Sequence, residues 1–137
     1  MEKQETIVPV LAGIIENAEK RILLTRRKPH LSNAGKWEFP GGKLHPGEQP
    51  PACLQRELRE ELGIDVRVEQ PFEIVNFSYD QEHILLIAYR CQYRGGQIRL
   101  VDHDRYEWVS PKELLKYDLS AADIPIAQRL CCEQCQT

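Results

Sequence analysis

The pattern of apolar positions in the first third of the chain predicts strands joined by a turn and a loop. The run over residues 7–15 is apolar and rich in β-branched side chains, which predicts a strand buried on both faces. A polar turn over residues 17–19 leads to a second predicted strand over residues 21–27. Proline, serine, asparagine and glycine in residues 28–36 predict a loop, which ends at a short apolar piece over residues 37–39.

A helical pattern follows this β-rich part. Leu54, Leu58 and Leu62 recur every four residues, so we expect one face of a helix over residues 51–62 to be core. A proline at its start suits the first helical turn, where a missing N–H costs nothing. Gly63 can adopt the left-handed conformation that ends many helices.

The second half of the chain alternates irregularly between the two patterns. Ser110 and Glu113 occupy the cap and capping-box positions of a helix start. The other predicted elements are strands over residues 72–79, 84–93 and 106–109, a turn over 94–97, and a last helix from 121 or 122 to about 131. This order predicts an α/β (α+β) fold in which a mixed β-sheet lies between helices, as a single domain over residues 1–137.

Length and charge narrow the range of partners. With 137 residues, 42% of them apolar and 28% charged, the chain has the composition of one globular domain. The formal net charge of −3 weighs against nucleic-acid binding, which usually shows as a basic stripe. No segment resembles a signal peptide or a membrane span. We therefore expect a cytoplasmic monomer or homodimer with a small-molecule partner, and neither nucleic acid nor membrane.

The cysteines are odd in number, with five in the chain. In a reducing compartment we expect them to remain thiols. Cys132 and Cys135 have the spacing of half a zinc site, but no second pair or suitable histidine spacing accompanies them. We interpret them as surface thiols.

The candidate chemistry lies on the helix over residues 51–62. Glu57, Glu60 and Glu61 share one face of it, and their mutual repulsion would be relieved by a hard cation such as Mg²⁺ or Mn²⁺. A solvated acidic face balanced by arginines is the alternative interpretation. The glycines of the preceding Pro-Gly-Gly loop favour the metal, because they let a main-chain carbonyl approach it. Glu48 is placed to return to the helix and pair with Arg56.

The segment resembles the Nudix box at each of its fixed positions. These positions are Gly42, Glu48, Arg56, Glu57, Leu58, Glu60, Glu61, Gly63 and Ile64. The wider stretch from Lys36 to Lys43 resembles the MutT branch, and looser similarity extends from about Val8 to Leu130. The resemblance implies a Nudix fold and a pyrophosphohydrolase that converts a nucleoside triphosphate to the monophosphate and pyrophosphate.

The resemblance also implies roles for individual residues. Glu57, Glu60 and Glu61 would ligate the metal, together with the carbonyl of Gly41. Glu107 matches an additional glutamate that MutT-like enzymes supply from outside the box. Either Glu57 or Glu107 would take the proton from the attacking water, and the sequence leaves that choice open.

The residues implied in substrate binding are Arg27, Glu38, Phe39 and Asp123. MutT has asparagine where Asp123 stands, and an ionised aspartate would only accept hydrogen bonds, as suits the amino group of cytosine. A protonated aspartate could imitate asparagine and suit 8-oxoguanine. Residues 117–125 also resemble the CTP pyrophosphohydrolases, and Glu82 replaces an arginine of MutT. Oxidised purine and cytosine-type substrates therefore both remain open, as do another nucleoside diphosphate derivative and a non-hydrolytic nucleotide-binding module.

Overall fold

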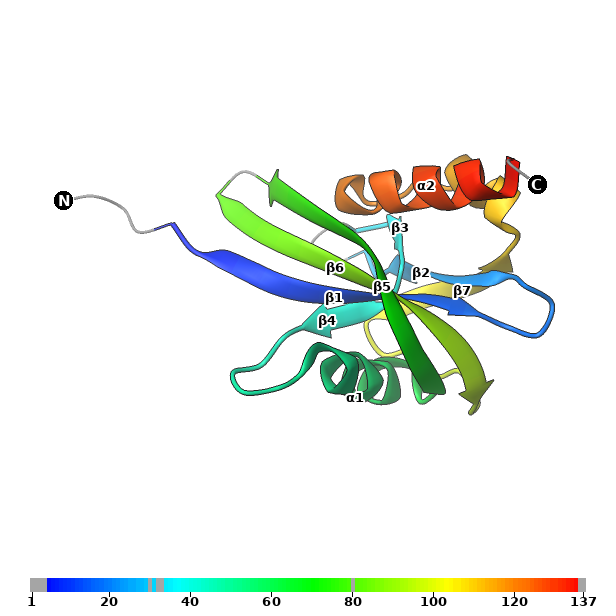
Figure 1. The fold of residues 1–137 in the computed structure, drawn as a ribbon, viewed down its shortest axis with the longest axis horizontal. Helices are drawn as coiled ribbons and strands as arrows, with labels where there is room; N and C mark the ends of the chain where they lie inside the picture. Colours follow the sequence, from blue (N-terminus) through cyan, green and yellow to red (C-terminus); the bar gives the residue numbers. More distant parts are fainter. Residues whose placement is uncertain (1–4, 30, 32–33, 80, 136–137) are drawn as a thin grey trace.

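One mixed sheet organises the computed structural model, which describes residues 5–29, 31, 34–79 and 81–135. Its strands are β1 (Ile7–Glu16), β2 (Ile22–Arg27), β3 (Trp37–Glu38), β4 (Gly41–Lys43), β5 (Asp65–Tyr79), β6 (Glu82–Gly95) and β7 (His103–Val109). The helices are α1 (Pro50–Leu62) and α2 (Ile124–Cys135), with 3₁₀ turns η1 (Pro111–Lys116) and η2 (Ala121–Asp123). The helices α1 and α2 lie on opposite sides of the sheet (Figure 1), which confirms the predicted fold class.

Strand β1 lies at the centre of this sheet. The strand order is β3-β2-β1-β6-β5, while β4 pairs with β1 and β7 pairs with β2. The β1–β6 pair is parallel, from Ile7 opposite His83 to Glu16 opposite Gln92, and the other pairs are antiparallel. The connection between β1 and β6 carries β2, β3, β4, α1 and β5, and it therefore contains the Pro-Gly-Gly loop and the glutamates of α1.

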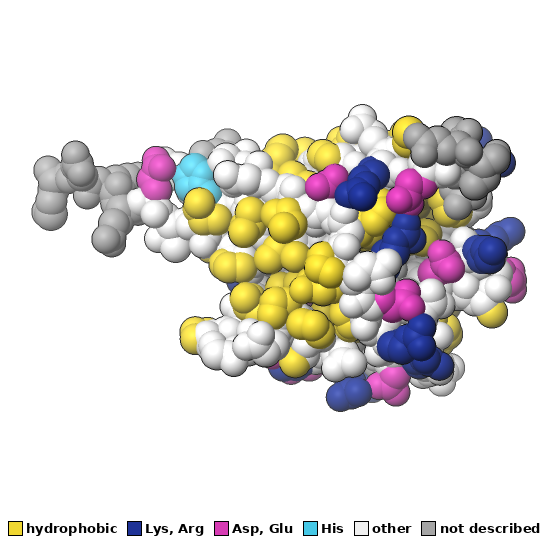
Figure 2. Space-filling view, viewed as in Figure 1, with side chains coloured by type: hydrophobic (Ala, Val, Ile, Leu, Met, Phe, Trp, Pro, Cys, Tyr) yellow, Lys and Arg dark blue, Asp and Glu magenta, His cyan; other side chains and the backbone are white. Residues whose placement is uncertain are grey.

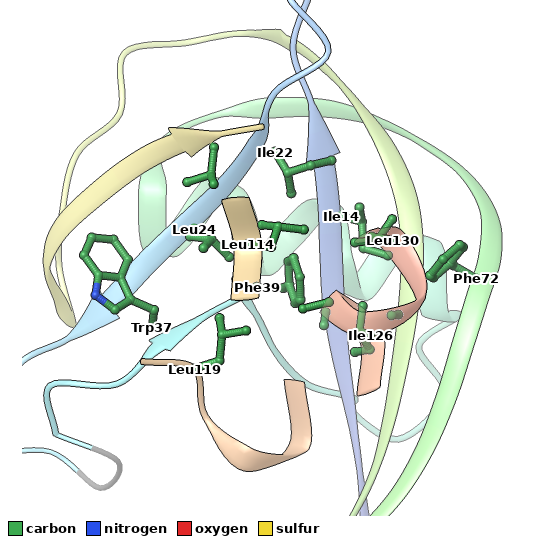
Figure 3. Packing of buried hydrophobic residues seen from close by; sticks show 14 of the residues in the cluster. Ile14, Ile22, Leu24, Trp37, Phe39, Phe72, Leu114, Leu119, Ile126 and Leu130 are labelled. Atoms are coloured by element: carbon green, nitrogen blue, oxygen red, sulfur yellow. The ribbon is translucent and has the colours of Figure 1, made fainter. Parts of the chain in front are cut away.

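Two hydrophobic clusters hold the layers together. On one face, the predicted stripe of Leu54, Leu58 and Leu62 packs with Leu11 and Ile15 of β1. On the other face, Ile126 and Leu130 of α2 pack on the sheet and form the cluster beneath α2 (Figure 3). The sheet side of this cluster includes Ala12 and Ile14 of β1, Ile22 and Leu24 of β2, and Phe39. Successive β1 side chains therefore enter opposite clusters, which explains its unbroken apolar sequence.

The outer half of β1 is less buried than we expected. Ile7 is 53% exposed and residues 8–10 are half-buried, whereas residues 11–15 are buried. Neither helix covers the strand there, and hydrophobic side chains gather at the surface of the region of β1, β5 and β6 (Figure 2). Burial on both faces is thus correct only for residues 11–15.

The ends of α1 agree with the predicted proline and glycine signals, whereas the segment after Ser110 differs from the predicted helix. Helix α1 has proline in its first turn, and Gly63 ends it with φ 70°, donating its N–H to the carbonyl of Arg59, as predicted. Ser110, in contrast, makes no side-chain capping bond, and the segment after it is the 3₁₀ turn η1. The predicted helix start is correct in position, since Ser110 is the N-cap residue of Pro111–Lys116, but the side-chain bond from Ser110 that a capping box requires is absent.

Strand boundaries differ most where bulges occur. Strand β5 begins at Asp65 instead of residue 72, with register shifts between Val68 and Glu73 around Pro71. Strand β7 begins at His103 instead of 106, and the predicted glycine loop contains the short strand β4. A bulge interrupts the alternation of apolar and polar residues, and proline is uncommon within a strand, so the period-two pattern did not indicate these parts of the strands.

The cysteines whose side chains the structure describes differ in exposure. Cys53 and Cys91 are buried, Cys131 is half-buried and Cys132 is exposed. The side chain of Cys135 lies outside the described side chains, so the zinc alternative is not tested there. In the described part of the chain, no helix combines the length and apolar character needed to cross a bilayer.

Candidate functional site

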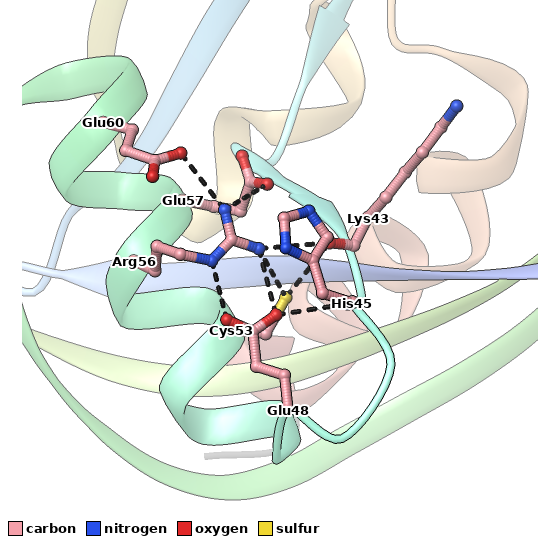
Figure 4. A network of polar contacts seen from close by, with 7 residues as sticks. All are labelled: Lys43, His45, Glu48, Cys53, Arg56, Glu57 and Glu60. Carbon is pink, nitrogen blue, oxygen red and sulfur yellow. Dashed lines mark hydrogen bonds and ion pairs between the residues drawn. The ribbon is translucent and has the colours of Figure 1, made fainter.

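An arginine–glutamate pair fastens the loop after β4 to α1. The Nε of Arg56 donates to Oε2 of Glu48 at 2.6 Å, and its Nη2 donates to Oε1 at 3.0 Å (Figure 4). The backbone N–H of His45 also donates to Glu48. Hydrogen bonding to Arg56 lowers the pKa of Glu48 to about 2. The predicted Glu48–Arg56 pair is confirmed, and its two-pronged geometry fixes both distance and orientation.

The same guanidinium reaches the acidic face of α1. Nη1 of Arg56 donates to Glu57 at 3.0 Å and to Glu60 at 3.1 Å. The Glu57 side chain is 13% exposed and that of Glu60 is 59% exposed, so the two occupy the inner and outer parts of this face. Arg56 thereby offsets the repulsion between the two carboxylates.

The Pro-Gly-Gly loop lies directly against Glu57. Gly41 and Gly42 pair with Ala12 and Leu11 of β1. A Cβ atom on Gly42 would lie 2.2 Å from Cδ of Glu57, and one on Gly41 would lie 1.8 Å from the carbonyl oxygen of Leu11. Only glycine permits both approaches. The role of the Gly41 carbonyl as a metal ligand stays a prediction.

Glu61 faces a carboxyl group that sequence analysis missed. Its Oε2 is buried and has no hydrogen-bond partner among the described residues, while its carboxyl group shares a hydrogen bond with Asp102. Burial raises the pKa of Glu61, and the neighbouring Asp102 and Glu57 raise it further. Asp102 directly precedes β7, and only the pairing of β7 with β2 brings it to α1.

The carboxylates are near one another without forming a closed cluster. Within the described residues, no three His, Cys, Asp or Glu side chains are gathered tightly enough to hold a metal ion. Their present partners explain this arrangement, because Glu57 and Glu60 are hydrogen-bonded to Arg56 and Glu61 is hydrogen-bonded to Asp102. A bound cation would compete with these partners for the same oxygens.

Glu107 lies on the other face of the sheet. It stands opposite Leu24 of β2, which belongs to the cluster beneath α2, whereas the adjacent pair of Leu23 and Trp108 packs on the α1 side. Its carboxylate lies 3.3 Å from Arg105. The structure does not bring Glu107 to the glutamates of α1, which corrects the expectation that it ligates the same metal or takes a proton there.

The four predicted substrate-binding residues do come together. They line a cavity of about 240 Å³ that η2 borders just before α2. The residues that line it are Val10, Leu11, Arg27, Glu38, Phe39, Gly41, Gly42, Lys43, Tyr79, Glu82, Ile84, Leu86, Ser120, Ala122 and Asp123. Gly42 therefore borders both this cavity and Glu57.

Asp123 is a buried polar group of the cavity wall. It is 4% exposed, and burial raises its pKa well above the ordinary value. The negative charge of Glu38 raises that pKa further, while a hydrogen bond from the backbone N–H of Phe39 opposes the shift. These surroundings favour the protonated carboxyl group, which can donate as well as accept.

Glu38 is held by two side chains. Its Oε1 lies 2.9 Å from Nε2 of His103 and 3.8 Å from Nε of Arg27. His103, the first residue of β7, is buried, and sequence analysis did not single it out. A lone histidine in a polar run gave no signal, because its contact with Glu38 depends on two strands that both pair with β2.

A family model and curated relatives match most of the chain. The NUDIX domain model matches residues 7–130. The chain is 38% identical to the CTP pyrophosphohydrolase of Escherichia coli over 89% of its own length and 90% of that protein. It is 33% identical to the 8-oxo-dGTP diphosphatase of the same organism over 88% and 94%.

Solved structures agree with this result. The E. coli ORF135 protein superimposes with a TM-score of 0.84 at 34% identity, over 96% of this chain and 94% of that one. The MutT protein of Methanosarcina mazei superimposes with a TM-score of 0.86 at 29% identity, over 97% and 99%.

The two loop glycines should respond differently to alanine. We predict that Gly42→Ala folds, because the clashing atoms are the mobile end of Glu57, but loses most of its activity when that carboxylate is displaced. Gly41→Ala should instead lower the free energy of unfolding, because its Cβ clashes with the β1 backbone. Urea unfolding and turnover measurements on both variants check this. Equal losses of stability in the two would contradict the distinction.

The burial of Asp123 should appear in the pH dependence of stability. Because its native pKa is raised above the unfolded value of 3.8, the native state binds more protons in the window between the two values. The stabilisation that comes from protonated Asp123 is complete below that window. As pH rises through the window, the free energy of unfolding falls by up to about 1.4 kcal/mol per pH unit. Asp123→Asn removes this titration. Urea unfolding from pH 4 to 8 should show the Asp123→Asn variant gaining stability relative to the parent as pH rises, and parallel curves would refute the assignment.

Proposed function

The chain belongs to the NUDIX domain family and is a hydrolase, and we propose that it converts nucleoside triphosphates to monophosphates and pyrophosphate with bound Mg²⁺ or Mn²⁺. One observation carries this proposal. Gly42 forms part of the wall of a nucleoside-sized cavity and also lies against Glu57 on the acidic helix face. A nucleotide whose base lies near Asp123 would therefore extend its phosphates past Gly42 toward those carboxylates.

The carboxylates of α1 and the neighbouring Asp102 suit a hard divalent cation. Glu57, Glu60, Glu61 and Asp102 supply carboxylate oxygens, the ligands that Mg²⁺ and Mn²⁺ prefer. The buried, unpartnered Oε2 of Glu61 and the facing carboxyl group of Asp102 are arrangements that a cation would stabilise. When bound, the metal would neutralise the triphosphate charge and make a water molecule more acidic.

The chain's own residues supply the rest of the reaction. Glu48 holds Arg56, and Arg56 orients Glu57 beside Gly42. Glu57 is the remaining candidate for the general base, because Glu107 lies on the opposite face of the sheet. Lys43 lines the cavity next to Gly42, where its cation suits a phosphate oxygen.

The cavity favours a base edge with one donor beside one acceptor. A protonated Asp123 presents one of each. Cytosine offers its amino group next to N3, and 8-oxoguanine offers its N7–H next to O6, so both are complementary. The same edge of unmodified guanine presents the acceptors N7 and O6, and would leave an acceptor of Asp123 facing an acceptor of the base. We therefore propose cytosine or 8-oxoguanine nucleotides, in preference to guanine, as substrates.

Removing the carboxylates should abolish turnover without unfolding the protein. We predict that Glu60→Gln or Glu61→Gln lowers kcat by at least about a hundredfold, because each removes negative charge from the metal site. Chelation of divalent metal should have the same effect. Glu113→Gln, at an exposed glutamate of η1, serves as the matched control. Normal turnover in a folded Glu61→Gln variant would remove the metal assignment.

A substrate panel tests the base preference. Steady-state hydrolysis with Mg²⁺ should be compared for CTP, dCTP, 5-hydroxy-dCTP, 8-oxo-dGTP and dGTP, with pyrophosphate and phosphate resolved as products. We expect pyrophosphate release and a kcat/KM for a cytosine or 8-oxoguanine substrate at least about tenfold above that for dGTP. Preference for a nucleotide sugar or dinucleoside polyphosphate would overturn the proposal. Tight binding without hydrolysis would indicate a nucleotide-binding module.

A further inference from the structure

His103 is a buried polar residue that the proposed reaction does not use. Its side chain is 4% exposed and stands at the first position of β7, with its Cα opposite that of Arg27 on β2. Its Nε2 lies 2.9 Å from Oε1 of Glu38, which belongs to β3. In the tautomer that carries its proton on Nε2, His103 donates a hydrogen bond to Glu38.

The other ring nitrogen shows that this histidine is not placed for stability alone. Nδ1 is buried and has no hydrogen-bond partner among the residues that the structure describes. A buried polar atom without a partner costs free energy, so such atoms are rare in native proteins and call for a specific reason. The position would be more stable with an apolar side chain if it served only to pack β7 on β2.

The contact of His103 with Glu38, a residue of the cavity wall, explains why a polar side chain occupies this position. Glu38 lines the cavity beside Phe39 and Asp123, and its Oε1 is engaged by His103 and approached by Arg27. The carboxylate is thereby held from outside the cavity, on the side of β7. Its orientation toward a ligand is fixed before the ligand enters, which reduces the entropy lost on binding.

We propose that His103 is a positioning residue for the nucleoside, and that it holds Glu38 so that this carboxylate accepts a hydrogen bond from an amino group of the base. The inference rests on the proposed function, since it assigns the cavity to the nucleoside. A carboxylate acceptor requires a donor on the ligand, and the proximity of Glu38 to Asp123 places that donor on the base. Cytosine meets both requirements, with its amino group for Glu38 and N3 for the proton of Asp123.

The test separates binding from catalysis. Binding of CMP and UMP is measured by calorimetry in the presence of EDTA, so that neither metal nor hydrolysis contributes. We expect His103→Ala to weaken CMP binding about tenfold, as for the loss of one charge-assisted hydrogen bond. UMP carries an oxygen instead of the amino group, and its binding should change less than about twofold. His103→Gln keeps an N–H donor on a longer side chain and should restore most of the CMP affinity.

Coupling between the two residues provides the decisive outcome. Glu38→Gln should weaken CMP binding by a similar factor, and the double variant should be no weaker than either single variant. In steady-state kinetics the His103→Ala effect should appear in KM, with kcat changed less than about twofold. Additive losses, equal losses for CMP and UMP, or an effect confined to kcat would each overturn the proposal.

Two controls keep the test interpretable. His83→Ala removes a histidine that is hydrogen-bonded to Ser78 and does not line the cavity, and it should leave CMP affinity unchanged. Thermal unfolding of every variant excludes loss of fold, and His103→Gln remains informative where His103→Ala is unstable. If the parent protein binds CMP but hydrolyses no triphosphate, the proposed reaction fails while the role of His103 is still decided by the binding data.

Discussion

The contact between Arg56 and Glu48 is the constraint on which the rest of the site depends. Two of the guanidinium nitrogens are committed to Glu48, which fixes the loop after β4 against α1. The third nitrogen is then directed at Glu57 and Glu60, and it offsets repulsion that would otherwise separate them. With the loop fixed, Gly42 can lie against Glu57. One planar, permanently charged group therefore holds both the backbone and the carboxylates of the site, a task that the flexible point charge of lysine could not perform.

Strand β1 connects this arrangement to the cavity. It is buried by α1 on one face and by α2 on the other, and β4 pairs with it through Gly41 and Gly42. The cavity, which Val10 and Leu11 line, and the glycines that lie against Glu57 thus share a rigid central strand. Sites built on such packed elements keep their geometry better than sites on loops, which suits a reaction that depends on positioning and electrostatics.

The sequence was most informative where the relevant contacts are local. The spacing of Glu48 and Arg56, the leucine stripe of α1 and the cap at Gly63 are set within a few turns of chain, and each was predicted correctly. Asp102 and His103 could not be found in this way, because the pairing of β7 with β2 places them. The same pairing explains the misassignment of Glu107. Beyond the register shift between Arg26 and Arg27, Glu107 stands opposite Leu24, so its side chain lies on the face that carries the Leu24 cluster.

The cavity shows how two carboxyl groups can acquire opposite roles. Arg27 and His103 lie against Glu38, while burial, and then the charge of Glu38, raise the pKa of Asp123. The result is an acceptor and a donor side by side, although both residues carry the same functional group. In the proposed function, selectivity for a base would be a joint property of the two groups. A change at His103 would then alter the surroundings of Asp123 through Glu38 without touching it, so the proposed determinants of substrate choice extend beyond the cavity wall to β7.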